Sequence, residues 1–307
     1  MKAVKDFKLD EKSSVDELVR QMEASGGFTA KNLGMAADVL ERMLKEKSCL
    51  NFISFPACIV ATGTRGIIKE MIRKKWFDVV ITTCGTLDHD VARSYKDYYH
   101  GSFLMDDRKL HRKGINRLGN VLVPNESYGF VIEDKMQEWL KEIYAEGKRE
   151  LATYELCWEI GKRLKKDSIL YWCWKNGIHM IVPGITDGAV GYQIWQFSQT
   201  HNFKIDILED EKLLSDLIWN AKKSGALIVG GGISKHHTIW WNQFKHGLDY
   251  AVYITTAVEY DGSLSGARTR EAISWGKIKE SAKHVTIEGD ATILLPIIAV
   301  ALFERLK

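Results

Sequence analysis

Cysteine is scarce in this chain and follows no recognisable pattern. The 307 residues contain five cysteines, and none of them forms a C-x-x-C pair or a cysteine–histidine spacing suited to metal binding. An odd number of scattered cysteines is typical of reduced thiols in the cytoplasm and not of a disulfide framework. The sequence therefore predicts a cytoplasmic protein without disulfides and without a metal site.

Neither sign of charge is in excess. The chain has 43 lysine and arginine residues against 40 aspartate and glutamate residues, which gives a formal net charge of +3. Proteins that bind nucleic acid usually show a basic excess or a basic stripe. We therefore expect no nucleic-acid partner.

Long hydrophobic runs are also missing. Residues 1–7 lack the apolar core of a signal peptide, so none is expected. The most apolar tract, residues 291–303, is too short to span a bilayer and contains Pro296. It predicts a buried C-terminal helix and no membrane partner.

The pattern of apolar segments indicates an α/β fold. A strand over 50–55, a helix over 64–75 and a strand over 77–83 followed by a loop at 84–90 form a βαβ sequence typical of parallel sheets. Further strands are expected at 168–172, 179–182, 204–208, 226–229 and 250–254, and further helices at 15–22, 32–47, 133–145, 151–164, 211–223 and from 234.

The fold class predicted is a doubly wound, mainly parallel Rossmann-like sheet with an N-terminal helical extension. We expect a single domain over 1–307, of which 1–48 is the helical segment, because no repeat or long linker divides the chain. The G-x-G-x-x-G dinucleotide fingerprint is absent, so any nicotinamide cofactor must be held in another way.

The most informative stretch is residues 259–277, a Gly- and Ser-rich loop followed by a short turn that ends in Trp275-Gly276-Lys277. Gly276 allows unusual backbone conformations, and Trp275 can form one wall of a pocket. An amine held there would lose hydration and react as a nucleophile. From these residues alone, an ordinary surface lysine is an equally good interpretation.

This stretch, E-Y-D-G-S-L-S-G-A-R-T-R-E-A-I-S-W-G-K, resembles the motif of the deoxyhypusine synthase family. The motif's final lysine, the family's covalent nucleophile, falls on Lys277. Two further segments resemble the family, G-F-T-A-K-N-L-G from Gly27 and G-I-N-R-L-G-N-V-L-V-P-N-E from Gly114. The resemblance runs from 27 to 291 and is weakest before residue 25 and between 145 and 170.

The resemblance implies roles for individual residues. Lys277 and His236 are the catalytic pair, with His236 also contacting the polyamine. The other substrate-binding residues predicted are Glu271, Trp275, Gly262, Trp240 and Tyr192. The cofactor-binding residues predicted are Thr83, Gly85, Asp187, Gly231, Thr256, Ala257, Asp261, Ser265, Asp290 and Ala291.

The residue types alone leave alternatives open at several of these positions. Asp187 and Asp290 could each serve as a helix N-cap. The glycines at 230–232 could allow tight strand–helix packing. The pair His236-His237 could bind a metal, but no third ligand has a suitable spacing. Arg268 is expected to pair with a carboxylate.

The chain departs from the family's eukaryotic members in the substrate pocket. Leu264 and Tyr192 stand where those members have aspartates, Trp240 where they have an asparagine, and Asp88-His89 where they have a glutamate pair. The pocket is therefore expected to be less acidic and more aromatic. Trp240 and Tyr192 would replace ion pairs by cation–π contacts; a different amine donor or acceptor is the alternative.

The resemblance implies an NAD-dependent reaction. Spermidine loses a hydride to NAD, the resulting imine releases 1,3-diaminopropane, and Lys277 carries the aminobutyl group as an imine. A lysine of the translation factor 5A precursor accepts this group, and reduction yields deoxyhypusine. A homotetramer with sites at subunit interfaces is expected. The alternatives are a homospermidine synthase, with putrescine or another small amine as acceptor, and a non-catalytic module that binds NAD or polyamine.

Overall fold

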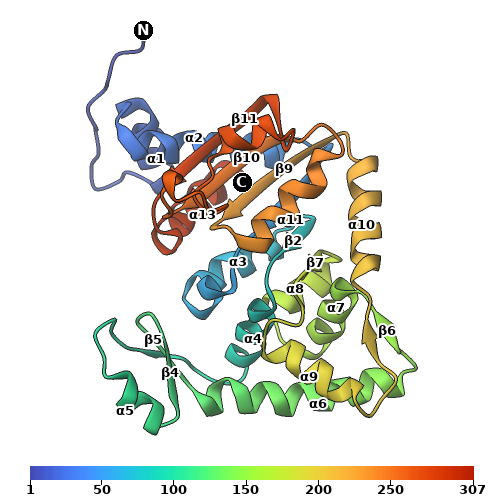
Figure 1. Cartoon of the computed structure of the whole chain (residues 1–307). Helices are drawn as coiled ribbons and strands as arrows, with labels where there is room; N and C mark the ends of the chain where they lie inside the picture. The colour runs from blue at the N-terminus through green and yellow to red at the C-terminus, as the bar shows by residue number, and fades with distance from the viewer. The chain divides into compact units, whose positions relative to one another are not determined.

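The computed structural model describes residues Met1–Lys307, and their contacts group them into two compact units. Unit 1 contains Met1–Phe55, Trp76–Ile81 and Leu213–Lys307, and unit 2 contains Pro56–Lys75 and Thr82–Lys212. Figure 1 shows the elements of both units coloured along the chain. The expected single domain over 1–307 stays a prediction.

A parallel sheet forms the centre of unit 1. Its five strands follow the order β11-β10-β9-β1-β2. The strands are β1 (Cys49–Ser54), β2 (Val79–Ile81), β9 (Lys223–Val229), β10 (Leu248–Thr255) and β11 (Ile278–Glu288). Ile53 pairs with Leu227, and Leu227 pairs with Val252, all of them buried. Apolar residues in consecutive positions are typical of parallel strands covered on both faces, and the predicted α/β class is confirmed.

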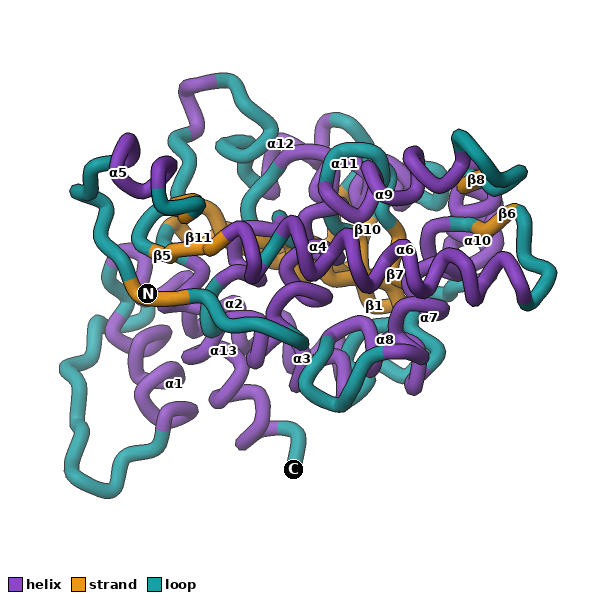
Figure 2. The backbone as a smooth tube through the Cα atoms, turned by 90° about the horizontal axis from the view of Figure 1, so that it is seen from below, coloured by secondary structure: helices purple, strands orange, loops and turns teal.

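Helices cover both faces of this sheet (Figure 2). α2 and α13 pack on one face, with α1 outside them, and α11 and α12 pack on the other. The helices of unit 1 are α1 (Val15–Ser25), α2 (Phe28–Lys45), α11 (Gly232–Gln243), α12 (Thr269–Ser274) and α13 (Ala291–Arg305), while α10 (Ile207–Asn220) starts in unit 2 and ends in unit 1.

Side-chain caps determine where several helices begin. The Ser14 side chain accepts a hydrogen bond from the Glu17 N–H at the start of α1. Asp290 accepts one from the Thr292 N–H, 2.6 Å away, at the start of α13, so the N-cap alternative for Asp290 is confirmed. α13 continues past Pro296 to Arg305, which confirms the predicted C-terminal helix.

Arg305 joins three helices of unit 1 through buried ion pairs. Its guanidinium contacts Asp16 of α1 and lies 2.6 Å from Asp38 and 3.3 Å from Glu41, both on α2. The Arg305 side chain is 0% exposed, whereas the three carboxylates are partly exposed. This cluster fixes α13 against the N-terminal helices.

Unit 2 is mostly helical. Its helices are α3 (Thr64–Arg73), α4 (Cys84–Arg93), α5 (Asp107–Arg112), α6 (Gly129–Ala145), α7 (Thr153–Arg163), α8 (Ile169–Asn176) and α9 (Ala189–Ser198). Its strands are β3 (Tyr99–His100), β4 (Ile115–Leu118), β5 (Val121–Pro124), β6 (Glu150–Leu151), β7 (His179–Ile181) and β8 (Lys204–Ile205). β3, β5 and β4 form an antiparallel sheet in that order, and β6 pairs with β8.

One buried carboxylate organises the helices of unit 2 and explains a wrong prediction. Asp90 accepts hydrogen bonds from the Arg65 Nε (2.7 Å) and from the Ile169 and Leu170 N–H groups (3.1 and 2.8 Å). These two N–H groups lie at the start of α8, and the Ser168 side chain caps this helix by accepting a hydrogen bond from the Tyr171 N–H. Residues 168–172, predicted as a strand, therefore begin α8.

Two other segments differ from the prediction. Residues 84–90, expected to be a loop, form most of α4. The strand predicted at 204–208 ends at Ile205, because Asp206 accepts a hydrogen bond from the Leu208 N–H at 2.8 Å and starts α10. α4 begins after Thr83 without a side-chain cap. At Asp206 a polar residue after a short apolar run starts a helix, which apolar periodicity alone does not reveal.

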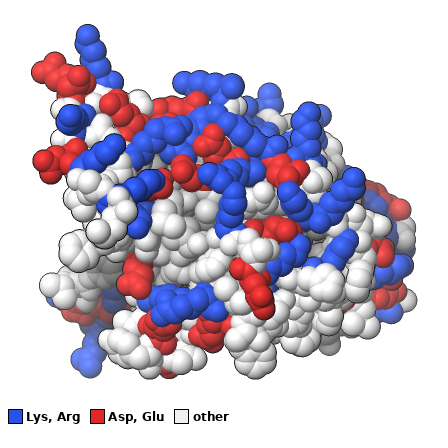
Figure 3. Space-filling model, turned by 90° about the horizontal axis from the view of Figure 1, so that it is seen from above, with Lys and Arg blue, Asp and Glu red and all other residues white.

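The surface carries charges of both signs. On the face shown in Figure 3, basic and acidic side chains are intermixed. None of the helices has the length and apolar character needed to cross a membrane.

We predict that Arg305→Met lowers the free energy of unfolding by about 3 kcal/mol, because it leaves three carboxylates without their buried partner. Thermal and urea unfolding would measure this loss. The matched control is Arg20→Met, which removes an arginine that pairs with the same Asp16 but is 56% exposed, and should cost less than about 1 kcal/mol. If both variants lost the same free energy of unfolding, burial of the Arg305 side chain would not explain its effect on stability.

Candidate active site

Several residues predicted to bind the cofactor lie at one edge of the sheet in unit 1. Gly231 follows β9, Thr256 and Ala257 follow β10, and Asp290 follows β11. These three strands are neighbours and parallel, so their carboxyl ends meet at the same edge (Figure 1). This edge is where ligands of parallel sheets usually bind.

Gly231 is needed for close packing of the loop after β10. A Cβ atom at Gly231 would lie 2.1 Å from the Ser265 Oγ. The Ser265 carbonyl is held in place by a hydrogen bond from the Thr255 Oγ1 at 2.9 Å. Packing thus accounts for this glycine, and contact of Gly231 or Ser265 with a cofactor stays a prediction.

A cavity of about 290 Å³ lies between α11 and the segment that contains α12. Five of the residues predicted for catalysis or substrate binding line it, namely His236, Trp240, Glu271, Trp275 and Lys277. The remaining lining residues are Lys235, Ile239, Tyr253, Leu264, Ala267, Arg268 and Ala272. Gly262 is exposed in the preceding loop and has a φ of 71°, which lies in the left-handed region that favours glycine.

Lys277 is largely buried. The residue is 8% exposed, and its Nζ lies 5.1 Å from the Trp275 ring centroid and 5.9 Å from that of Trp240. Gly276 has a φ of 65°, and this turn directs the chain so that the Lys277 N–H bonds the Ala272 carbonyl at 2.9 Å. The surface-lysine interpretation is therefore wrong.

His236 and Trp240 lie one turn apart on α11 and stack with ring centroids 5.6 Å apart. Burial and the nearby charge of Lys277 lower the pKa of His236 below its ordinary value. The imidazole is therefore neutral at pH 7 and can accept a proton.

The cavity offers one free carboxylate. Glu271 is the only acidic residue in its lining and is exposed to solvent. Arg268 also lines the cavity, but its guanidinium lies 2.7 Å from Glu288, so the expected carboxylate pairing is confirmed. Leu264 adds an apolar wall, and the lining is accordingly aromatic and only weakly acidic.

Sequence reasoning missed Lys235 and Tyr253. The Lys235 Nζ is 2.7 Å from the carbonyl oxygens of both Leu264 and Ala267, and 4.3 Å from the Tyr253 ring centroid. Burial lowers the pKa of Lys235 to about 8. The Tyr253 hydroxyl is buried without a hydrogen-bond partner. A signal existed for Lys235, which shares one face of α11 with the buried Thr238, Ile239 and Asn242.

The other predicted site residues belong to unit 2. Thr83 is the N-cap residue of α4, and Gly85 lies in the first turn of this helix, where a Cβ atom would be 2.9 Å from that of Ala57. Asp187 is exposed before α9, and Tyr192 is exposed on α9 with its ring centroid 5.5 Å from that of Trp195.

The pair Asp88-His89 has a structural explanation. Asp88 accepts hydrogen bonds from the Ala189 and Val190 N–H groups at 2.9 and 2.8 Å, so Asp88, and not Asp187, caps α9. The His89 Nδ1 lies 2.9 Å from the Tyr98 hydroxyl. Burial and the charge of Arg93 lower the pKa of His89 to about 4, which leaves this imidazole neutral.

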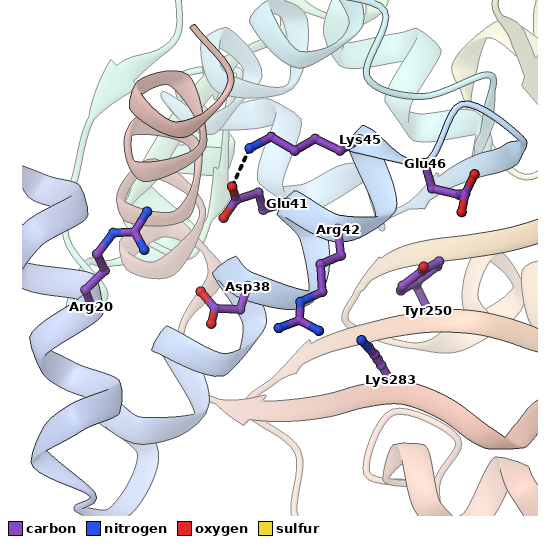
Figure 4. A pocket seen from close by; sticks show the side chains of 8 residues that line it. All are labelled: Arg20, Asp38, Glu41, Arg42, Lys45, Glu46, Tyr250 and Lys283. Carbon is purple, nitrogen blue, oxygen red and sulfur yellow. Dashed lines mark hydrogen bonds and ion pairs between the residues drawn. The ribbon is translucent and has the colours of Figure 1, made fainter.

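A second hollow in unit 1 differs in character from the cavity that Lys277 lines. Its lining is charged and comes from α1, α2, β10 and β11 (Figure 4). Its carboxylates already have partners, since Asp38 and Glu41 pair with Arg305, and Glu46 pairs with Lys223. It has the features of a solvated surface. No group of three His, Cys, Asp or Glu side chains in the structure could hold a metal ion.

Comparison with known proteins agrees with these features. Residues 17–302 match the family described as deoxyhypusine synthase. A probable deoxyhypusine synthase of Picrophilus torridus is 54% identical over 96% of this chain and 95% of its own length. That of Thermoplasma acidophilum is 53% identical with the same coverage.

Solved structures show the same fold. A putative deoxyhypusine synthase from Entamoeba histolytica superposes with a TM-score of 0.68 at 19% identity, covering 98% of this chain and 97% of that one. The complex of AgrE with ornithine and NAD+ gives a TM-score of 0.56 at 10% identity, over 91% of this chain and 34% of AgrE.

A parallel sheet covered by helices, with a buried lysine in an aromatic cavity, defines this chain as an α/β enzyme. The share of the chain that the matches cover and their sequence identity specify which enzyme family this is. The chain belongs to the deoxyhypusine synthase family, and its reaction is the aminobutyl transfer that forms deoxyhypusine. The alternatives of a homospermidine synthase and of a non-catalytic module are not favoured.

We predict that Lys277→Met raises the pKa of His236 toward its ordinary value, because the substitution removes a nearby positive charge. Burial should keep the pKa somewhat lowered. Titration of the histidine ring signals by NMR would measure the change. Lys279→Met is the control, since its amine pairs with Asp249 at 2.8 Å and lies outside the cavity lining. An unchanged pKa of His236 in Lys277→Met would contradict the electrostatic effect of Lys277 on His236.

Proposed function

We propose that Lys277 is the nucleophile that carries the 4-aminobutyl group of spermidine as an imine. One observation carries this proposal, namely that Lys277 is 8% exposed, with its amine beside two indole rings and in no ion pair. An amine attacks carbon in its neutral form, and no carboxylate pairs with this amine to hold a proton on it. Other groups in the same cavity suit the remaining requirements of the reaction.

The lining of the cavity suits an aminobutyl chain. Trp240 and Trp275 present aromatic faces that attract ammonium groups, and Glu271 can pair with one of them. His236, neutral at pH 7, can take the proton that spermidine's secondary amine loses. The apolar side chains of Ile239 and Leu264 keep water from the imine, which would otherwise hydrolyse.

The sheet edge next to the cavity fits a dinucleotide. No side chain caps the N-terminus of α11, so its free N–H groups can bind a diphosphate. A Cβ atom at Gly232 would meet nothing within 4 Å, which leaves room for a ligand. When bound, NAD takes up a hydride and returns it. Gly231, Thr256, Ala257, Asp261, Ser265, Asp290 and Ala291 form the proposed cofactor set of unit 1. Contact of Thr83, Gly85 and Asp187, which belong to unit 2, with the cofactor stays a prediction.

The charge of the cavity supports assembly with further copies of the chain. Spermidine is a polycation, and each of its ammonium groups needs a partner when it leaves water. One carboxylate, Glu271, does not suffice. We therefore propose a homotetramer with sites at subunit interfaces, acting in the cytoplasm on the translation factor 5A precursor. Tyr192 and Gly262 are proposed to contact the substrate in that assembly.

We predict that borohydride added with spermidine and NAD attaches the aminobutyl group to Lys277, because reduction traps the imine. Mass spectrometry of peptides would locate the label. Lys277→Ala should lower the transfer to the 5A precursor by at least roughly a thousandfold while the unfolding temperature stays unchanged.

The chain offers two internal controls for this experiment. Lys279→Arg, two residues away in sequence, should keep its activity and the label on Lys277. Lys235 is the other lysine in the cavity lining. Label on Lys235 in the wild-type protein would refute the assignment of Lys277.

We predict that Glu271→Gln raises the KM for spermidine roughly tenfold, because a charge-assisted hydrogen bond to an ammonium group is lost. Release of 1,3-diaminopropane would give the rate, and the KM for NAD should change little. Glu280→Gln is the control, an exposed glutamate outside the cavity lining. An equal rise in both KM values would indicate that Glu271 acts on the fold of the site and not on the substrate.

A further inference from the structure

Lys235 is a buried charged residue to which neither the sequence analysis nor the proposed reaction gives a role. It lies on α11, and its residue is 1% exposed. The ammonium group donates hydrogen bonds of 2.7 Å to the carbonyls of Leu264 and Ala267 and lies over the Tyr253 ring. Burying a charge is unfavourable unless its hydrogen bonds are satisfied, and here main-chain carbonyls and an aromatic face provide them.

The carbonyls that Lys235 binds belong to residues 262–268, a segment without strand or helix pairing. Within the segment, the N–H groups of Gly266 and Ala267 both bond the Ser263 carbonyl at 3.1 Å. The carbonyls of Leu264, Ser265 and Ala267 are bound by side chains instead, from Lys235 and Thr255. A third side chain outside the segment, that of Asp261, accepts a hydrogen bond from the Ser263 N–H at 2.7 Å. The conformation of this segment therefore depends on side chains outside it, and Lys235 is the one that binds two of its carbonyls.

The same segment faces two parts of the site. Ser265 packs against Gly231 at the carboxyl edge of the sheet, where the cofactor is proposed to bind. Leu264, Ala267 and Arg268 line the cavity that contains Lys277. We propose that Lys235 is a positioning residue that holds residues 262–268 in one conformation. This segment in turn fixes the position of the cavity that Lys277 lines relative to the carboxyl edge of the sheet, where the cofactor is proposed to bind.

The chemistry of lysine suits this role. Its ammonium has three donors, so it can bridge two carbonyls while its remaining side faces an aromatic ring. A methionine would fill a similar volume but would leave both carbonyls unpaired, which is unfavourable in a buried place. Lys277, by contrast, forms no hydrogen bond with its amine and remains available for reaction.

The first test uses the unmodified protein without ligands. Hydrogen exchange measured by mass spectrometry should show residues 262–268 protected well above an exposed loop, because the N–H groups of Ser263, Gly266 and Ala267 are hydrogen-bonded although the segment has no regular secondary structure. Residues 101–106, an exposed segment of unit 2 without helix or strand, give the reference for fast exchange. Exchange of 262–268 as fast as that of 101–106 would overturn the proposal.

The second test is Lys235→Met. We expect exchange in 262–268 to become roughly ten- to a hundredfold faster, the range for lost hydrogen bonds to a charged group, with little change in β10. Lys245→Met is a matched control, because the Lys245 amine also bridges two carbonyls, those of Trp219 and Ala221, but lies outside the cavity lining. Equal acceleration in 262–268 and β10, or no acceleration, would overturn the positioning role.

A kinetic measurement separates this inference from the proposed function on which its catalytic part rests. In Lys235→Met, the KM values for NAD and spermidine should rise together, whereas Glu271→Gln should raise the KM for spermidine alone. A rise in only one of them would overturn the link between the two parts of the site. If the wild-type protein releases no 1,3-diaminopropane, the proposed function fails, and the exchange data still decide whether Lys235 holds the segment.

Discussion

The main-chain pairing of β9, β10 and β11 is the constraint on which the site depends. These strands are parallel and adjacent, so their carboxyl ends lie together and so do their amino ends. Gly231, Thr256 and Asp290 follow the carboxyl ends. Lys277 precedes β11, and its carbonyl accepts a hydrogen bond from the Leu248 N–H at the start of β10. A change in strand pairing would therefore move both ends of the site.

The segment between β10 and β11 connects these two ends. It begins at the carboxyl edge, passes the cavity as residues 262–268, forms α12 and ends at Lys277. α11 covers the same face of the sheet and contributes Lys235, His236 and Trp240 to the cavity. The substrate cavity is thus a space between one helix and one irregular segment, and its shape depends on how firmly that segment is held.

Burial changes the chemistry of several side chains in ways that suit the reaction. It lowers the pKa of His236 and leaves the Lys277 residue only 8% exposed. Asp88 and Asp90 in unit 2 are also buried carboxylates, but both accept several main-chain hydrogen bonds at helix starts and serve the fold. The hydrogen bonds that Asp88 and Asp90 receive thus occupy them in the fold, whereas the Lys277 amine has no hydrogen-bond partner.

The sequence by itself determined the α/β class and most helices, left an N-cap open as one of two roles for Asp290, and predicted Lys277 as the nucleophile, because apolar periodicity and a long motif are local properties. It did not determine that residues 84–90 and 168–172 are helical. The second of these helices begins where Asp90, far away in sequence, accepts hydrogen bonds from the Ile169 and Leu170 N–H groups. Only the tertiary structure revealed the contacts of Lys235 and Tyr253. Their partners come from other elements of the fold, and no spacing along the chain encodes which carbonyls a buried ammonium group will meet.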